Sequence, residues 1–171
     1  MTRRILSSVA ALALAALPIA DAVAACYTPA EAAAIHVRML QSELMVGALA
    51  CRDSNPELGM ISQYNAFVNR HSVRLVGENR VLERHFDKHY GAQCKRRMDT
   101  LLTALANDAS KRSMTPDFCH GAASLFGVIS VMEWPQLVRL SSERANGNGG
   151  GDALDTCTAA TRSKNSAATA R

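Results

Sequence analysis

Apolar residues recur at three- and four-residue steps along most of the chain, which is the spacing of helices that bury one face. The first such segment begins at residues 28–31 (TPAE). Thr28 can cap the helix, Pro29 suits its first turn, and Glu31 completes a capping box. The helix is expected to run to about Cys51, before the helix-breaking run DSNP. Its apolar stripe consists of Ile35, Met39, Leu40, Leu44, Val46 and Leu49.

Helical spacing continues over residues 57–90, which predicts one very long helix or two helices bent near Gly77. Gly91 suits the end of this segment as a C-cap. A third helix is expected over about 92–109. The apolar positions of the long segment are Met60, Tyr64, Phe67, His71, Leu75, Leu82 and Phe86.

A fourth helix is predicted to begin with the cap at residues 115–117 (TPD). It contains the uncharged run 121–132, which is too short to cross a membrane and therefore suggests the central, most buried helix. Pro135 is expected to kink or restart it. No segment shows sustained strand alternation. We therefore expect an all-α fold, an antiparallel up-down bundle of four to five helices with short loops.

The two ends of the chain have other patterns. Arg3 and Arg4 precede a short apolar run and the small residues AVA at 22–24, the order of a secretory signal peptide. We expect a signal peptide at 1–24, a helical domain at 25–144 and a secreted, periplasmic protein without a transmembrane helix. The glycine-rich run and the Ala, Ser and Thr residues after Arg144 predict a disordered tail at 145–171.

All five cysteines lie after the predicted cleavage site, so an oxidising compartment favours disulfides. If neighbouring helices alternate in direction, Cys26 and Cys94 lie at one end of the bundle and Cys51 and Cys119 at the other. Disulfides need Cα atoms within about 7 Å. We therefore predict the bonds Cys26–Cys94 and Cys51–Cys119, with Cys157 free or intermolecular. The alternative is a bacterial lipobox at 23–26 (VAAC), in which a lipid on Cys26 tethers the protein to a membrane.

The net charge of +4 is mild, but the basic residues are concentrated. Residues 70–97 hold eight basic side chains against three acidic ones. This region predicts contact with an acidic partner, either an envelope protein, a lipid or a glycan. It lacks the interleaved aromatic residues that stack nucleic-acid bases. The alternative is a solvated helix face with Glu-to-Arg pairs. The basic residues are Arg70, Arg74, Arg80, Arg84, Lys88, Lys95, Arg96 and Arg97.

His85 and His89 lie four residues apart, so both can reach one divalent metal ion from one helix face. In an antiparallel hairpin His36 falls at about the same depth and is the candidate third ligand. The competing interpretation is a set of half-buried histidines held by hydrogen bonds. Apart from this metal, no cofactor is expected.

No motif of a nucleophilic hydrolase is present, and Cys119 and His120 are adjacent residues that point about 100° apart on a helix. The lone Trp134 is expected to pack the end of the core, with an exposed binding anchor as the alternative. We therefore expect a non-catalytic binding or structural component of the cell envelope. Its partner and oligomeric state stay open. The metal-binding bundle is the second hypothesis.

Overall fold

The computed structural model describes residues 26–147, 154 and 156–157, and the predicted signal peptide lies outside them. The described residues are mostly helical and contain no strand beyond a single bridge between Tyr27 and Thr156. This confirms the predicted helical class. The elements are α1 (Pro29–Ala50), the 3₁₀ turn η1 (Pro56–Leu58), α2 (Met60–Tyr90), the 3₁₀ turn η2 (Gly91–Gln93), α3 (Cys94–Arg112), α4 (Phe118–Ile129) and α5 (Trp134–Gly147).

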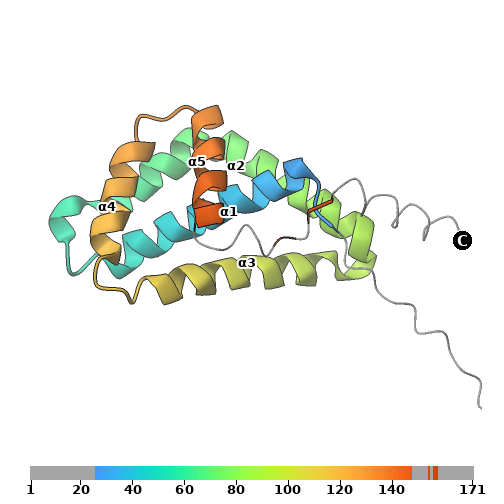
Figure 1. The fold of residues 1–171 in the computed structure, drawn as a ribbon, viewed down its shortest axis with the longest axis horizontal. Coiled ribbons are helices and arrows are strands. Elements are labelled where there is room, and N and C mark those ends of the chain that lie inside the picture. Colours follow the sequence, from blue (N-terminus) through green and yellow to red (C-terminus); the bar gives the residue numbers. More distant parts are fainter. Residues whose placement is uncertain (1–25, 148–153, 155, 158–171) are drawn as a thin grey trace, which may run out of the picture.

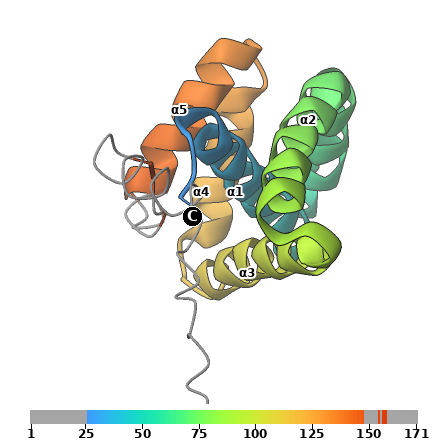
Figure 2. The same cartoon turned by 90° about the vertical axis from the view of Figure 1, so that its right-hand side faces the viewer.

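Helix α1 is the centre of the fold. It begins with the predicted capping box, in which the Thr28 hydroxyl accepts from the Glu31 N–H at 3.3 Å and the Glu31 carboxylate accepts from the Thr28 N–H at 2.7 Å. The other four helices all contact α1, and Figure 2 shows it in their midst. Nine of its 22 residues are buried.

The uncharged run at 121–132 does not form the central helix, so that prediction is wrong. Helix α4 ends at Ile129, and Gly121, Ser124 and Gly127 on it are exposed. Small residues cost little when they face water, so the absence of charge did not indicate burial here. Its buried residues are Ala122, Leu125, Phe126 and Ile129.

Helix α2 is one continuous helix of 31 residues, which decides between the two alternatives left by the sequence. Gly77 is exposed inside it and has no atom near the position of a Cβ. The helix ends at Gly91, where a φ of 49° favours glycine. Pro135 lies in the first turn of a separate helix, because α5 begins at Trp134.

The helices are arranged in two directions. Figure 1 shows α1, α2 and α3 lying along the long axis of the molecule, while α4 lies across them near one end and α5 crosses α1 near its middle. The predicted up-down bundle is therefore not confirmed as a whole. Because α4 and α5 cross α1, these two short helices cover only one part of it. The other part of α1 packs against α3.

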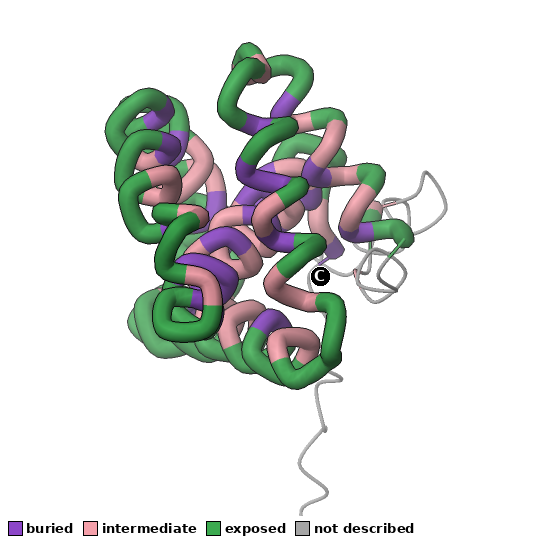
Figure 3. The backbone as a smooth tube through the Cα atoms, turned by 90° about the vertical axis from the view of Figure 1, so that its left-hand side faces the viewer, coloured by how far each residue is buried: buried purple, intermediate pink, exposed green. Residues whose placement is uncertain are grey.

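Buried side chains form two clusters along α1. The larger one joins α1 and α2 to α4 and α5, and Leu44 and Phe126 are among its members. The smaller one joins α1 and α2 to α3, and it contains Ile35, Leu82 and Phe86. Figure 3 shows the buried residues on the sides of the helices that face one another, with the outer sides exposed.

Helices α1 and α4 approach closely at Gly47. A Cβ at this position would stand 2.9 Å from the Cβ of Ala122, which is too short for two carbon atoms that are not bonded. Only glycine therefore fits here without a shift of one helix.

The structure contains two disulfides, and one of them differs from the prediction. Cys51 is bonded to Cys119 with a Cα–Cα distance of 5.6 Å, which confirms that predicted pair. Cys26 is bonded to Cys157 and not to Cys94, which is free. Helix lengths explain the error. At 1.5 Å per residue α2 is about 46 Å long and α1 about 33 Å, so α2 carries Cys94 beyond the start of α1.

The tail also differs from the prediction. Helix α5 continues through the buried Ala145 to Gly147, so the boundary at 145 is too early. Farther along, Leu154 packs against the smaller cluster and the Cys157 N–H donates to the Tyr27 carbonyl at 2.8 Å. Because its sulfur is bonded to Cys157, Cys26 cannot carry the lipid of the lipoprotein alternative. The rest of the predicted tail lies outside the described residues.

Candidate functional site

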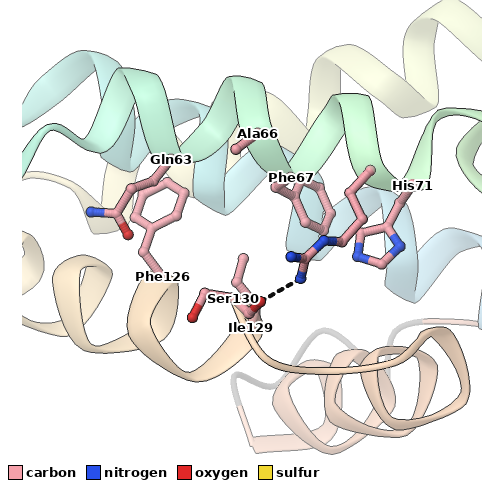
Figure 4. A pocket seen from close by; sticks show the side chains of 8 residues that line it. Gln63, Ala66, Phe67, His71, Phe126, Ile129 and Ser130 are labelled. Carbon is pink, nitrogen blue, oxygen red and sulfur yellow. Dashed lines mark hydrogen bonds between the residues drawn. The ribbon is translucent and has the colours of Figure 1, made fainter.

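A cleft lies between the middle of α2 and the turn that joins α4 to α5. Its inner part is a cavity of about 130 Å³ whose apolar walls are Phe67, Phe126 and Ile129. Figure 4 shows these side chains together with the polar groups at the mouth. The outer part is a wider hollow of about 630 Å³ that reaches Trp134. The cleft thus combines an apolar interior with a polar entrance.

His71 lines both parts of the cleft. Its side chain lies between two aromatic rings, with centroid distances of 5.4 Å to Phe67 and 5.5 Å to Trp134. The residue is 6% exposed, and its buried Nε2 has no hydrogen-bond partner among the described residues. Burial lowers the pKa of His71, the nearby Arg70 lowers it further, and Glu133 opposes the shift.

Arg70 joins the two walls of the cleft. Its Nη1 donates to the carbonyl of Ser130, the residue that ends α4, so a cation sits at the negative end of the helix dipole. Figure 4 shows this bond across the mouth. Arg74 stands one turn farther along α2 and lines the outer part with Glu133. No ion pair within the described chain involves either arginine. The lining of the entrance therefore holds two cations and one carboxylate.

The lowered pKa of His71 predicts a pH-dependent stability. The folded protein holds a neutral His71 where the unfolded chain, with a pKa near 6.5, takes up a proton. The contribution of neutral His71 to the free energy of unfolding is therefore fully present above that pH. This contribution is lost as the pH drops from about 7 toward 5. In urea unfolding at a series of pH values, His71→Phe should lose less stability over this range than the wild type. An equal loss in both proteins would contradict the assignment.

His85 is the centre of a second cluster, at the start of α1. Its side chain is fully buried, and its Nδ1 lies 3.2 Å from the Glu31 carboxylate. The ring stacks on Tyr27 at 4.5 Å and lies 4.7 Å from the ring of His89. Burial alone would raise the pKa of Glu31, but hydrogen bonds from Thr28 and the proximity of His85 outweigh it and lower the pKa.

The structure does not bring the three predicted metal ligands together. The Nδ1 of His36 lies 3.2 Å from the Ser142 hydroxyl of α5, while His85 and His89 stand beside Glu31. In the described part of the chain, no three His, Cys, Asp or Glu side chains are arranged to hold a metal ion. The hypothesis of a site on His85 and His89 stays a prediction.

The predicted basic residues fall into two groups. Arg70 and Arg74 belong to the cleft. The other six are exposed side chains on the second half of α2 and the start of α3, and we name them the basic surface: Arg80, Arg84, Lys88, Lys95, Arg96 and Arg97. Arg97 lies over the Tyr90 ring at 5.2 Å.

The Glu-to-Arg pairs of the alternative interpretation are not found on the basic surface. Arg80, Arg84 and Lys88 make no ion pair with any described residue. Nearby, Glu83 accepts from Asn79 instead. The three cations follow one another at four-residue steps, so each stands next to a like charge on the helix.

Sequence reasoning missed the cleft, because its walls come from two stretches far apart in the chain, residues 63–74 and residues 126–134. The signals were the two prolines near helix starts, Pro116 and Pro135, and the single Trp134, which packs against His71. The predicted cap at 115–117 is not formed, because the Asp117 side chain makes no capping hydrogen bond. No helix among the described residues is both long enough and apolar enough to span a bilayer. No family model, curated protein or solved structure matches the chain.

Proposed function

We propose that this chain is a non-catalytic binding protein of the cell envelope whose basic surface contacts an anionic partner. The observation that carries the proposal is the row Arg80, Arg84 and Lys88, exposed and without ion pairs in the described chain. Like charges four residues apart on a helix cost about 0.2–0.5 kcal/mol per pair. An anionic partner would relieve this repulsion and gain from electrostatic steering.

The proposed location of this partner rests on the disulfides and on the predicted signal peptide. Two disulfides are compatible with a secreted protein. A signal peptide at 1–24 would deliver the chain to the periplasm or beyond it.

We also infer that α1, α2 and α3 alternate in direction, so the turn between α2 and α3 presents the basic surface at one end of the molecule.

The proposal predicts that charge reversal on the basic surface abolishes partner capture. The variant Arg80→Glu/Arg84→Glu/Lys88→Glu is immobilised and exposed to solubilised envelope from the protein's own source. We expect it to retain no partner that the wild type retains, because all three cations are exposed and unpaired in the described chain. Capture by the wild type should weaken as salt rises.

A matched control separates the basic surface from net charge. The variant Arg52→Glu/Lys111→Glu/Arg139→Glu also reverses three exposed cations, but these lie in the turn after α1, at the end of α3 and on α5, and none belongs to the basic surface. Unlike the three cations of the test variant, Arg52 pairs with Asp53. The control variant should capture the partner as the wild type does. Equal capture by all three proteins would sink the proposal, and equal loss in both variants would show that only net charge matters.

A further inference from the structure

We propose that the cleft between α2 and the α4–α5 turn binds a small aromatic carboxylate, with its ring in the inner cavity and its carboxylate at Arg70 and Arg74. This site is separate from the basic surface. It goes beyond the proposed function and uses none of the residues that carry it.

The size and lining of the inner cavity favour an aromatic ring as the part of the ligand that binds there. A volume of about 130 Å³ is close to that of a cavity of about 150 Å³ that holds benzene. Phe67 and Phe126 offer aromatic contacts to a flat guest, and Ile129 closes the apolar wall. The inner cavity alone is too small for a whole sugar or a long acyl chain.

The charged side chains at the entrance favour a ligand that carries a carboxylate. Arg70 and Arg74 line the entrance with one carboxylate, that of Glu133, while Glu78 interacts with Arg74 from outside the lining. Arg70 is held in place by the Ser130 carbonyl, and a guanidinium has five N–H donors, so further donors remain for a ligand. Guanidinium groups bind planar carboxylates in a bidentate manner. An anion is therefore favoured over a neutral or cationic ligand.

His71 supplies a further observation. Its buried Nε2 has no partner in the described structure, and an unsatisfied buried polar atom is costly. The ring lies where the inner and outer parts of the cleft meet. In the tautomer that carries its proton on Nε2, this nitrogen has a donor to offer to an oxygen bound at this junction. The ligand would thus satisfy an atom that folding leaves without a partner.

The test uses the disulfide-bonded protein and benzoate as the probe. Trp134 is the only tryptophan of the chain and lines the outer part of the cleft, so its fluorescence reports binding directly. We expect saturable binding with a dissociation constant in the millimolar range or below, as suits so small a ligand. Benzyl alcohol, which has the ring without the charge, should bind at least tenfold more weakly. Inorganic phosphate should not compete.

Two variants test whether benzoate binds in the cleft. Arg74→Gln removes one cation, and Ala66→Leu fills the inner cavity from an exposed position that the core does not need. Each should weaken benzoate binding at least tenfold in calorimetry. The matched controls Arg139→Gln and Ala104→Leu alter exposed residues on α5 and α3 and should bind as the wild type does.

Three results would overturn the proposal. The first is no benzoate binding at tens of millimolar. The second is wild-type affinity in both cleft variants. The third is displacement of benzoate by phosphate, which would mean that the arginines bind anions in general without the apolar cavity.

Discussion

Replacing Cys51 and Cys119 together by alanine should lower the free energy of unfolding by about 4 kcal/mol. The bond joins residues 68 positions apart, and the chain-entropy relation gives about 4 kcal/mol for a loop of this length. Cys51 is also fully buried in the larger cluster, so the loss of its sulfur removes packing at the end of α1. Urea unfolding with the Cys26–Cys157 bond intact measures the effect.

The control for this variant is Cys94→Ala. Cys94 is free and half-buried at the start of α3, so its replacement should cost about 1 kcal/mol or less. A double variant that is no less stable than this control would show that the bond between α1 and α4 contributes little. The slope of the unfolding curve should be compared too, because losing a crosslink exposes more surface in the unfolded chain.

Phe126→Ala should destabilise the protein by about 3–5 kcal/mol. Phe126 is 1% exposed and packs in the larger cluster, and one of its ring carbons lies 4.0 Å from the position of a Cβ on Gly47. The close contact of α1 with α4 at Gly47 leaves the helices little freedom to collapse into the space, so most of the cavity should persist. The midpoint of urea unfolding measures the loss.

Val128→Ala is the matched control on the same helix. Val128 is 45% exposed, so its truncation should change the free energy of unfolding by about 0.5 kcal/mol or less. Similar losses in both variants would contradict the placement of Phe126 in the core. Because Phe126 also lines the inner cavity of the cleft, its truncation should also alter the benzoate affinity of a protein that remains folded.

Much of the fold could be predicted from local signals in the sequence. The capping box at Thr28 and Glu31 marks the true start of α1, and the apolar spacing identifies each of the long helices. These predictions depend on neighbours along the chain, where backbone and side-chain chemistry decide the outcome.

The wrong predictions concern features that depend on the lengths of the helices and on how the helices cross one another. Equal helices would bring Cys94 to Cys26, but the overhang of α2 separates them. The same simplification placed His36 beside His85, whereas His36 contacts Ser142 because α5 crosses α1. The cleft depends on that crossing too, since α4 and α5 meet α2 around His71. Periodicity reports which face of a helix is buried and not which neighbour covers it.

The Cys26–Cys157 bond makes the described chain a covalent ring that spans 131 residue positions, with the Cys51–Cys119 bond nested inside it. A protease that cuts one peptide bond anywhere between residues 26 and 157 therefore opens the ring without releasing a fragment. The two pieces stay attached through the Cys26–Cys157 bond. In an environment rich in proteases, a molecule nicked once therefore loses no segment until a reductant cleaves the disulfides that join its pieces.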